Sequence, residues 1–414
     1  MARSMKGCRR RTASPLYADE NSSPIEISLF INDNQIHYEV SVKFGEVNYR
    51  SMERRPSNLS FSELELFHGQ INHSLQNMKE NERGYNYWYD LASKGHDLYV
   101  HLFPVEEVRE AITQVYDLLH NTRTEEYIYP PCKITVLLRN TRINIPWELL
   151  YIAGPAPNTA ENDAESFDYS RFLGYYFSPT QDLSETSGFY RSLRCSGTPK
   201  VRAYYCDQLE VAATKELSFL RQLASSEKIS LDIGRAYQPS SAVSLSQEKA
   251  SFVSELIQDD SSFVHFACHS GIDKITHDNY FRIRDDFVVD RRDFISDTQP
   301  FLFDKILFFN SCELSQAWSS NYATLIRDLI SIKDAYGVLA TEIEIKDEDA
   351  FLFASLLFSN LLQTNSLKMA IFITRRQILK DHQSMIGFTY SFYARGDYQI
   401  IPTVDISPEE AKAA

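Results

Sequence analysis

Two apolar stretches of the chain are each followed by a side chain that can take part in nucleophilic catalysis. One begins at Phe263 and leads to His269, and the other begins at Ile306 and leads to Cys312. A thiol attacks well only as the thiolate, and a nearby imidazole supplies the base that forms it and later helps to protonate the leaving amine. These residue types predict acyl transfer, with Cys312 as the nucleophile and His269 as its acid and base.

Small residues lie beside both of these groups. Ser270 and Gly271 follow the histidine, and Ser311 precedes the cysteine. Small side chains let backbone N–H groups approach an oxyanion, a stabilisation typically worth roughly 3 kcal/mol per donor. We therefore expect the amides of Gly271 and Cys312 to form the oxyanion hole.

The last half of the chain has to bring these residues together. There, extended apolar stretches alternate with segments of helical spacing, a pattern that indicates crossover connections and a mostly parallel sheet covered on both faces. The predicted strands are 201–206, 229–233, 263–268, 306–310 and 337–345, and the predicted helices are 213–224, 247–257 and two that start near Asp347 and Ser366. The carboxyl ends of parallel strands share one edge of a sheet, so His269 and Cys312 can become neighbours there.

The first half reads as mixed α and β. Alternating apolar residues from Ile25 to Tyr49, interrupted by Asn32-Asp33-Asn34, predict a β hairpin, and helical spacing dominates 60–91 and 105–119. The fold class we expect is α/β, a three-layer sandwich with a mostly parallel sheet, preceded by a mixed α+β part. The expected divisions are a tail at 1–24, the mixed part at 25–190, the α/β part at 191–402 and a tail at 403–414.

The amino-acid composition restricts the binding partners and the cellular compartment that we expect for this protein. The 414 residues include 42 Lys and Arg against 56 Asp and Glu, a net charge of −14 that disfavours direct nucleic-acid binding. A basic run at Arg9-Arg10-Arg11 is interpreted as part of a disordered tail, with a targeting or nucleic-acid arm as the alternative. The six cysteines show no paired-thiol spacing and no secretory signal precedes them, which favours reduced thiols in the cytoplasm. We expect no membrane span, because no apolar run approaches the roughly 18 residues that a span needs.

The motifs around the two reactive residues resemble those of CHAT-domain proteins, the caspase- and separase-like family. FVHFACHSG at 263–271 and ILFFNSCE at 306–313 look like that family's two catalytic motifs, and further matches occur in the right order at 98–104, 145–150, 337–348 and 392–396. The resemblance covers roughly residues 25–402. It implies a caspase-like three-layer sandwich in which His269 is the catalytic histidine and Cys312 is the nucleophile. It also implies that residues 25–190 are the accessory lobe, and residues 191–402 the catalytic lobe, of the same unit.

Two positions depart from the family pattern. The family usually has Gly directly after the histidine, where this chain has Ser270, and this puts the oxyanion-hole geometry in doubt. Relatives often carry Trp where this chain has Ile343, which changes the wall of the substrate pocket.

A pair of acidic residues are candidates for substrate binding. By resemblance, Asp347 lies near the pocket for a basic P1 side chain, where a carboxylate would pair with Arg or Lys of the substrate. Asp347, Glu348 and Asp349 also open an apolar helix, where acids cap N–H groups and suit the helix dipole. Glu344 is a second candidate, and an exposed acid at a strand end explains it equally well.

The function we expect is that of a cysteine endopeptidase that cleaves a partner protein or peptide and needs neither metal nor organic cofactor. By resemblance it is kept latent until an activating partner arrives, in bacterial defence or programmed death. The alternatives are a catalytically inactive interaction module, a metal site of Cys268, His269 and Cys312, and a nucleotide-binding protein. The last of these lacks a glycine-rich phosphate loop after a strand.

Overall fold

The structure is a computed structural model that describes most of the chain. The described residues are 24–32, 35–80, 85–122, 132–139, 145–154, 167–183, 192–206, 208–234, 244–272, 279–284, 286–311, 322–341, 345–394 and 396–401. Cys312, Ile343 and Glu344 lie outside them, as does the basic run at Arg9 to Arg11.

The elements follow one another as short strands and helices of up to 20 residues. The strands are β1 (Ile25–Asn32), β2 (Gln35–Phe44), β3 (Val47–Arg50), β4 (Arg55–Ser60), β5 (Cys132–Arg139), β6 (Phe177–Asp182), β7 (Leu193–Ser196), β8 (Lys200–Tyr205), β9 (Ser230–Ile233), β10 (Phe263–Ile272), β11 (Asn279–Arg284), β12 (Phe287–Asp290), β13 (Ile306–Ser311), β14 (Gly337–Thr341), β15 (Tyr390–Ala394) and β16 (Tyr398–Ile401). The α-helices are α1 (Phe61–Glu80), α2 (Tyr85–Leu102), α3 (Glu106–Thr122), α4 (Leu173–Tyr176), α5 (Leu217–Ser225), α6 (Leu245–Gln258), α7 (Arg291–Ser296), α8 (Tyr322–Ser331), α9 (Asp347–Thr364) and α10 (Leu367–His382). Short helical turns are η1 (Trp147–Leu149), η3 (Tyr169–Arg171), the π-helical η4 (Ala212–Glu216) and η6 (Ile386–Thr389).

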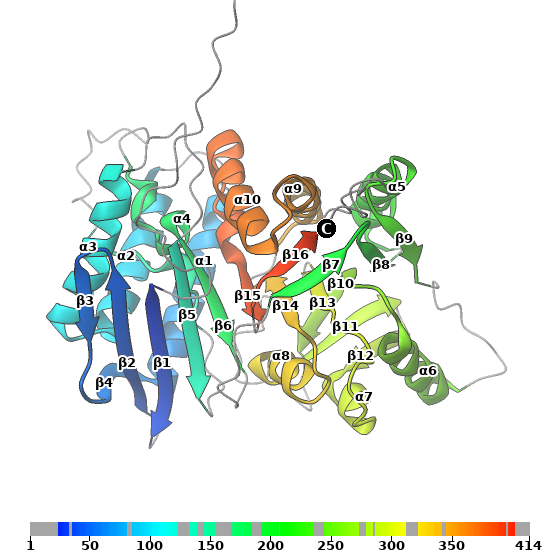
Figure 1. The fold of residues 1–414 in the computed structure, drawn as a ribbon, viewed down its shortest axis with the longest axis horizontal. Helices are drawn as coiled ribbons and strands as arrows, with labels where there is room; N and C mark the ends of the chain where they lie inside the picture. The colour runs from blue at the N-terminus through cyan, green and yellow to red at the C-terminus, as the bar shows by residue number, and fades with distance from the viewer. Residues whose placement is uncertain are drawn as a thin grey trace, which may run out of the picture.

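One 14-stranded sheet runs through the molecule, in the order β12-β11-β10-β13-β14-β15-β6-β5-β1-β2-β3; β8 also pairs with β10, β9 pairs with β8, and β4 pairs with β2. The strands β9, β8, β10, β13 and β14 are parallel to one another. β15 runs antiparallel to β14 and parallel to β6, which continues through β5 to β1. The expected α/β fold with a mostly parallel sheet is thereby confirmed, and the sheet is shared by the two halves of the chain (Figure 1).

Helices cover both faces of the parallel part, which gives three layers. Figure 1 shows α5, α9 and α10 over one face and α6, α7 and α8 over the other. The side chains of β10 alternate between these two layers of helices. His265 contacts Phe358 of α9, whereas Phe266 contacts Phe281, which in turn contacts Phe294 of α7. Alternate residues of one strand therefore face different helical layers.

Local sequence accounts for the helix starts near the site. α10 begins after Ser366, whose hydroxyl accepts from the amide of Met369, and this is the start expected from the sequence. α9 carries Asp347, Glu348 and Asp349 in its first turn, where their negative charge suits the helix dipole. The N-terminal hairpin of β1 and β2 is also where the sequence placed it.

Two expectations for the elements need correction. β14 ends at Thr341, and Ile345 lies outside any strand, so the strand predicted for 337–345 is too long. β10 continues to Ile272 instead of ending at Cys268, because β11 pairs with its last residues. Within the described ranges, every helix is too short or too polar to cross a bilayer.

Candidate active site

The two strands that precede His269 and Cys312 are direct neighbours. β10 and β13 pair in parallel from Phe263 opposite Ile306 to Cys268 opposite Ser311. His269 follows Cys268 on β10, and Cys312 follows Ser311 in the sequence. The structure thus brings the immediate predecessors of both candidates together, while Cys312 itself lies outside the described residues.

His269 lies within β10 and is partly exposed. Its antiparallel partner on β11 is Arg282, so the two side chains share one face of the sheet. The Nδ1 atom of His269 is buried and has no hydrogen-bond partner in the described part of the chain. Arg282 is a neighbour that the sequence did not identify, because the pairing of β11 with β10 is visible only in the folded chain.

Ser270 does not intrude on the face that carries His269. Successive side chains of a strand alternate between faces, and the side chain of Ser270 is buried at 2% exposure. Gly271 returns to the face of His269, where an added Cβ would come within 2.8 Å of the Tyr280 hydroxyl. The departure from the family pattern at Ser270 therefore places its hydroxyl on the opposite side of the sheet.

Backbone groups along β10 alternate between its two edges. The carbonyl of Ala267 accepts from the amide of Cys206, so this carbonyl points to the β8 edge. Every second residue faces the same way, which places the amide of Gly271 toward β11 and that of Ser270 toward β13. For a nucleophile at the end of β13, Ser270 is the better placed donor, and this differs from the expectation for Gly271.

Asp347 begins α9 after the connection from β14, which is parallel to β13. Its helix therefore starts on the same edge of the sheet as the end of β13. Asp347 is partly exposed, and its neighbour Glu348 accepts from Lys215 at 2.8 Å. Both interpretations of Asp347, as a pocket acid and as a helix-start acid, are compatible with this position.

Cys268 is a core residue. Its side chain is fully buried, and burial raises the pKa of its thiol well above the ordinary value. In the ranges that the structure covers, no three His, Cys, Asp or Glu side chains come together to hold a metal ion. This core position supports the interpretation of Cys268 as an apolar filler of the strand.

A buried polar cluster lies on the same face of the sheet as His269 and includes His265, four residues earlier on β10. His265 bonds through Nε2 to Oε1 of Glu216, which also accepts from Nδ2 of Asn310 at 3.0 Å. Tyr390 donates to Oδ1 of Asn310 at 2.6 Å. All four side chains are buried. The sequence signal for this cluster was a single amide, Asn310, inside an apolar strand, and its partners are too distant along the chain to be identified from sequence.

No protein-family profile and no curated protein sequence matches this chain. Solved structures do match, at low identity. The separase–securin complex of Saccharomyces cerevisiae is 13% identical over 91% of this chain and 30% of that chain, with a TM-score of 0.45. The Drosophila initiator caspase Dronc is 13% identical over 53% of this chain and 85% of that chain, with a TM-score of 0.31. The pro- and mature domains of RgpB from Porphyromonas gingivalis are 9% identical over 69% of this chain and 68% of that chain, with a TM-score of 0.36.

The chain spans less than a third of the length of the separase that it matches. With TM-scores this low, we draw no functional conclusion from these likenesses, and the fold rests on the strand order and pairing given above.

Proposed function

We propose that this chain is a cysteine endopeptidase of the CHAT, caspase- and separase-like kind, in which His269 and Cys312 act as a catalytic pair. The observation that carries the proposal is the parallel register of β10 and β13, which pairs Cys268 with Ser311. If the register extends by one residue, Cys312 comes opposite His269. Neighbouring strands lie about 4.8 Å apart, a spacing that lets an imidazole reach a thiol on the same face.

The reaction follows from the chemistry of the two groups. His269 takes the proton of the Cys312 thiol, and the sulfur attacks the carbonyl carbon of a peptide bond. The carbon–nitrogen bond then breaks, and the amine leaves with the proton held by His269. Water, deprotonated by His269, attacks the resulting thioester, releasing the new carboxyl group and restoring the thiol. No metal or organic cofactor enters this scheme.

The negative charge that develops on the carbonyl oxygen of the substrate needs hydrogen-bond donors at the same edge of the sheet as the nucleophile. We assign this role to the amides of Cys312 and Ser270, with Ser270 replacing Gly271 because of the edge that its amide faces. Asp347 remains the candidate acid of the pocket for a basic P1 side chain, since α9 begins on the same edge. Glu344 keeps the same candidate role on sequence grounds alone.

The substrate is a protein or peptide, and an activating partner protein raises the activity above the basal level of the isolated chain. We place the catalytic unit at residues 191–402 and the accessory lobe at 25–190. Both assignments come from the resemblance, and the continuous sheet is compatible with a unit in which the accessory lobe supports the catalytic one.

The test is a comparison of the wild-type chain with Cys312→Ala and His269→Ala. Each protein is incubated with a library of proteome-derived peptides, and new termini are identified by mass spectrometry. A peptidyl acyloxymethyl ketone with Arg at P1 is used in parallel, because it labels a reactive cysteine even when turnover is slow. The proposal predicts cleavage and labelling of Cys312 by the wild type only.

Two results contradict the proposal. Cleavage that survives Cys312→Ala moves the activity to another residue. Absence of both cleavage and Cys312 labelling in the wild type favours the inactive interaction module.

A further inference from the structure

The side chain of Asn310 is held from three directions. Its amide nitrogen donates to Glu216 Oε1 and to the carbonyl oxygen of Ala350, each at 3.0 Å, and its amide oxygen accepts from the Tyr390 hydroxyl at 2.6 Å. These partners belong to η4, α9 and β15, three different elements. Both hydrogens of the amide and its oxygen are used, so the side chain has one favourable orientation.

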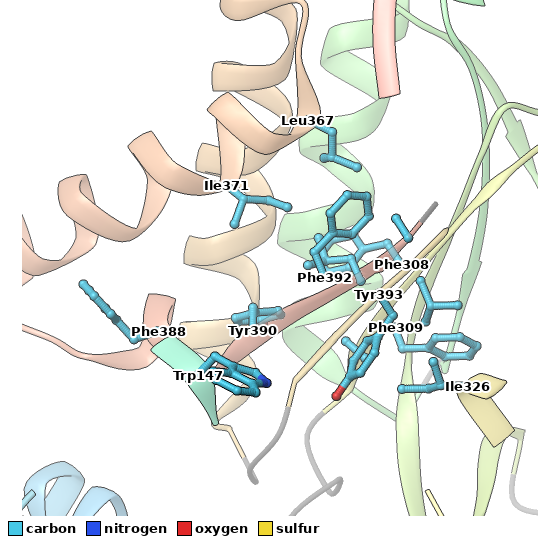
Figure 2. Close-up of a cluster of buried hydrophobic side chains, with 14 of the residues drawn as sticks. Trp147, Phe308, Phe309, Ile326, Leu367, Ile371, Phe388, Tyr390, Phe392 and Tyr393 are labelled. Atoms are coloured by element: carbon cyan, nitrogen blue, oxygen red, sulfur yellow. The ribbon is translucent and has the colours of Figure 1, made fainter. Parts of the chain in front are cut away.

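The partners of Asn310 are themselves fixed. The ring of Tyr390 stacks on Phe353 with centroids 3.5 Å apart and an interplanar angle of 3°. Figure 2 shows Tyr390 inside the buried cluster that also contains Phe308 and Trp147. Glu216 ends a π-helical turn and bonds to His265 of β10. π-Helical turns are rare and occur often at functional sites.

Asn310 lies on β13, two residues before Cys312 in the sequence. Alternate residues of a strand share a face and lie roughly 7 Å apart, so an anchor at Asn310 fixes the direction in which the chain approaches Cys312. Glu216 joins that anchor to His265, which lies four residues before His269 on β10. The cluster thus ties together the two strands that carry the reactive pair.

We propose that Asn310, held by Tyr390 and Glu216, is a positioning residue that sets the Cys312 thiol against His269. This inference rests on the proposed function, because it explains how the same pair is aligned. A small misplacement of a catalytic group costs up to about a hundredfold in rate, which gives a buried polar cluster under the site a physical purpose beyond packing. Such a cluster is costly in the core, all the more because the buried Nδ1 atom of His265 has no hydrogen-bond partner among the described residues.

Tyr390→Phe tests this directly, since it removes one hydroxyl and keeps the stacked ring. Tyr398→Phe is a matched control: Tyr398 is equally buried, and its hydroxyl bonds to Ser262 at 2.9 Å, just before the start of β10. Each change removes one hydroxyl that is hydrogen-bonded to a neighbouring side chain and keeps the ring. For each protein we measure the rate of Cys312 alkylation by iodoacetamide between pH 5 and 9, with glutathione as the reference thiol, and kcat and KM on a cleaved peptide.

The proposal predicts that Tyr390→Phe slows Cys312 alkylation about tenfold or more and moves its pH profile toward that of glutathione, with kcat reduced and KM little changed. Tyr398→Phe stays within about twofold of the wild type. Equal rates for Tyr390→Phe and the wild type overturn the positioning role alone. A wild-type Cys312 that reacts no faster than glutathione overturns the proposed function as well.

If Tyr390→Phe fails to fold, substitutions of Glu216 provide a second test of the positioning role of Asn310. Glu216→Gln keeps an oxygen acceptor for Asn310, whereas Glu216→Ala removes it. The positioning role predicts that Gln retains at least half of the Cys312 reactivity and that Ala loses about tenfold. Equal reactivity in the two variants contradicts it.

Discussion

Glu148 and Arg375 form a buried ion pair, with Oε1 and Nη2 2.7 Å apart, between the two halves of the chain. Arg375 also donates to the carbonyl oxygens of Gly387 and Tyr390, and Glu148 accepts from Ser391. Burial raises the pKa of Glu148, and the guanidinium of Arg375 opposes that rise. Because Tyr390 also donates to Asn310, a continuous line of buried polar contacts runs from Glu148 to the strand that precedes Cys312.

Removing one member of this ion pair should destabilise the chain strongly. Arg375→Met leaves the Glu148 carboxylate buried without its cation, a change that typically costs about 3–5 kcal/mol. Urea unfolding followed by tryptophan fluorescence measures the loss. Arg54→Met, which removes an exposed partner of Glu39, is the control and should cost less than about 1 kcal/mol. Similar losses of unfolding free energy in the two variants would contradict a stabilising role for the buried ion pair.

Exchange of the residue after His269 should matter little. Ser270→Gly restores the residue that the family usually has, and the hydroxyl it removes lies on the opposite face from His269. We expect peptide cleavage within about threefold of the wild type and a stability loss of about 1 kcal/mol. Gly271→Val is the contrasting change, because a side chain there meets the Tyr280 hydroxyl beside His269. It should reduce kcat at least about tenfold. A large rate gain in Ser270→Gly is the result that contradicts this account.

The cysteines of the native chain should differ in the rate at which they are alkylated. Cys268 is fully buried with its pKa raised by burial, so it holds little thiolate at neutral pH. Iodoacetamide at pH 7.5, followed by peptide mass spectrometry, should modify Cys312 quickly and Cys268 only after denaturation. Native labelling of Cys268 at the rate of Cys312 is incompatible with its position in the core.

The buried Lys305 predicts a pH dependence of stability. Its ammonium donates to the carbonyl oxygens of Leu256 and Asp259, and burial lowers its pKa to about 8 from 10.5. Between these values the unfolded chain binds more protons than the folded chain, so this group's contribution to stability rises with pH and is lost as pH falls toward 8.

The free energy of unfolding of the wild type minus that of Lys305→Met should therefore increase by up to about 3 kcal/mol from pH 8 to pH 10.5. Urea titrations at several pH values measure this difference. Lys200→Met, at an exposed ion pair with Asp260, serves as the control and should show no such increase. A difference in unfolding free energy between the wild type and Lys305→Met that does not change with pH would contradict the lowered pKa of Lys305.

The sequence predicted the elements that have strong local signals. The apolar stretches before His269 and Cys312 identified β10 and β13, and their crossover connections predicted the parallel pairing that the structure confirms. The acids of 347–349 and the cap at Ser366 predicted the starts of α9 and α10. These signals lie within a few residues of the feature that they define.

Features that depend on distant partners were beyond sequence reasoning. The pairing of His269 with Arg282 lengthened β10, and the parallel pairing of β15 with β6 joined the two halves into one sheet. Asn310 was visible as an amide in an apolar strand, but Glu216 and Tyr390 lie 94 and 80 residues away. Only the folded arrangement shows that these side chains meet.

The central claim, that residues 269 and 312 lie opposite each other across β10 and β13, is tested most directly by a disulfide trap. The variant His269→Cys, with Cys268→Ala to remove the adjacent thiol, is oxidised mildly and its linked peptides are mapped by mass spectrometry. Adjacent strands hold paired Cα atoms within the range of about 4.4–6.8 Å that a disulfide spans. We predict a disulfide between Cys312 and the new thiol at position 269. Recovery of both thiols in free form from the folded protein, open to alkylation and never linked, would contradict the account.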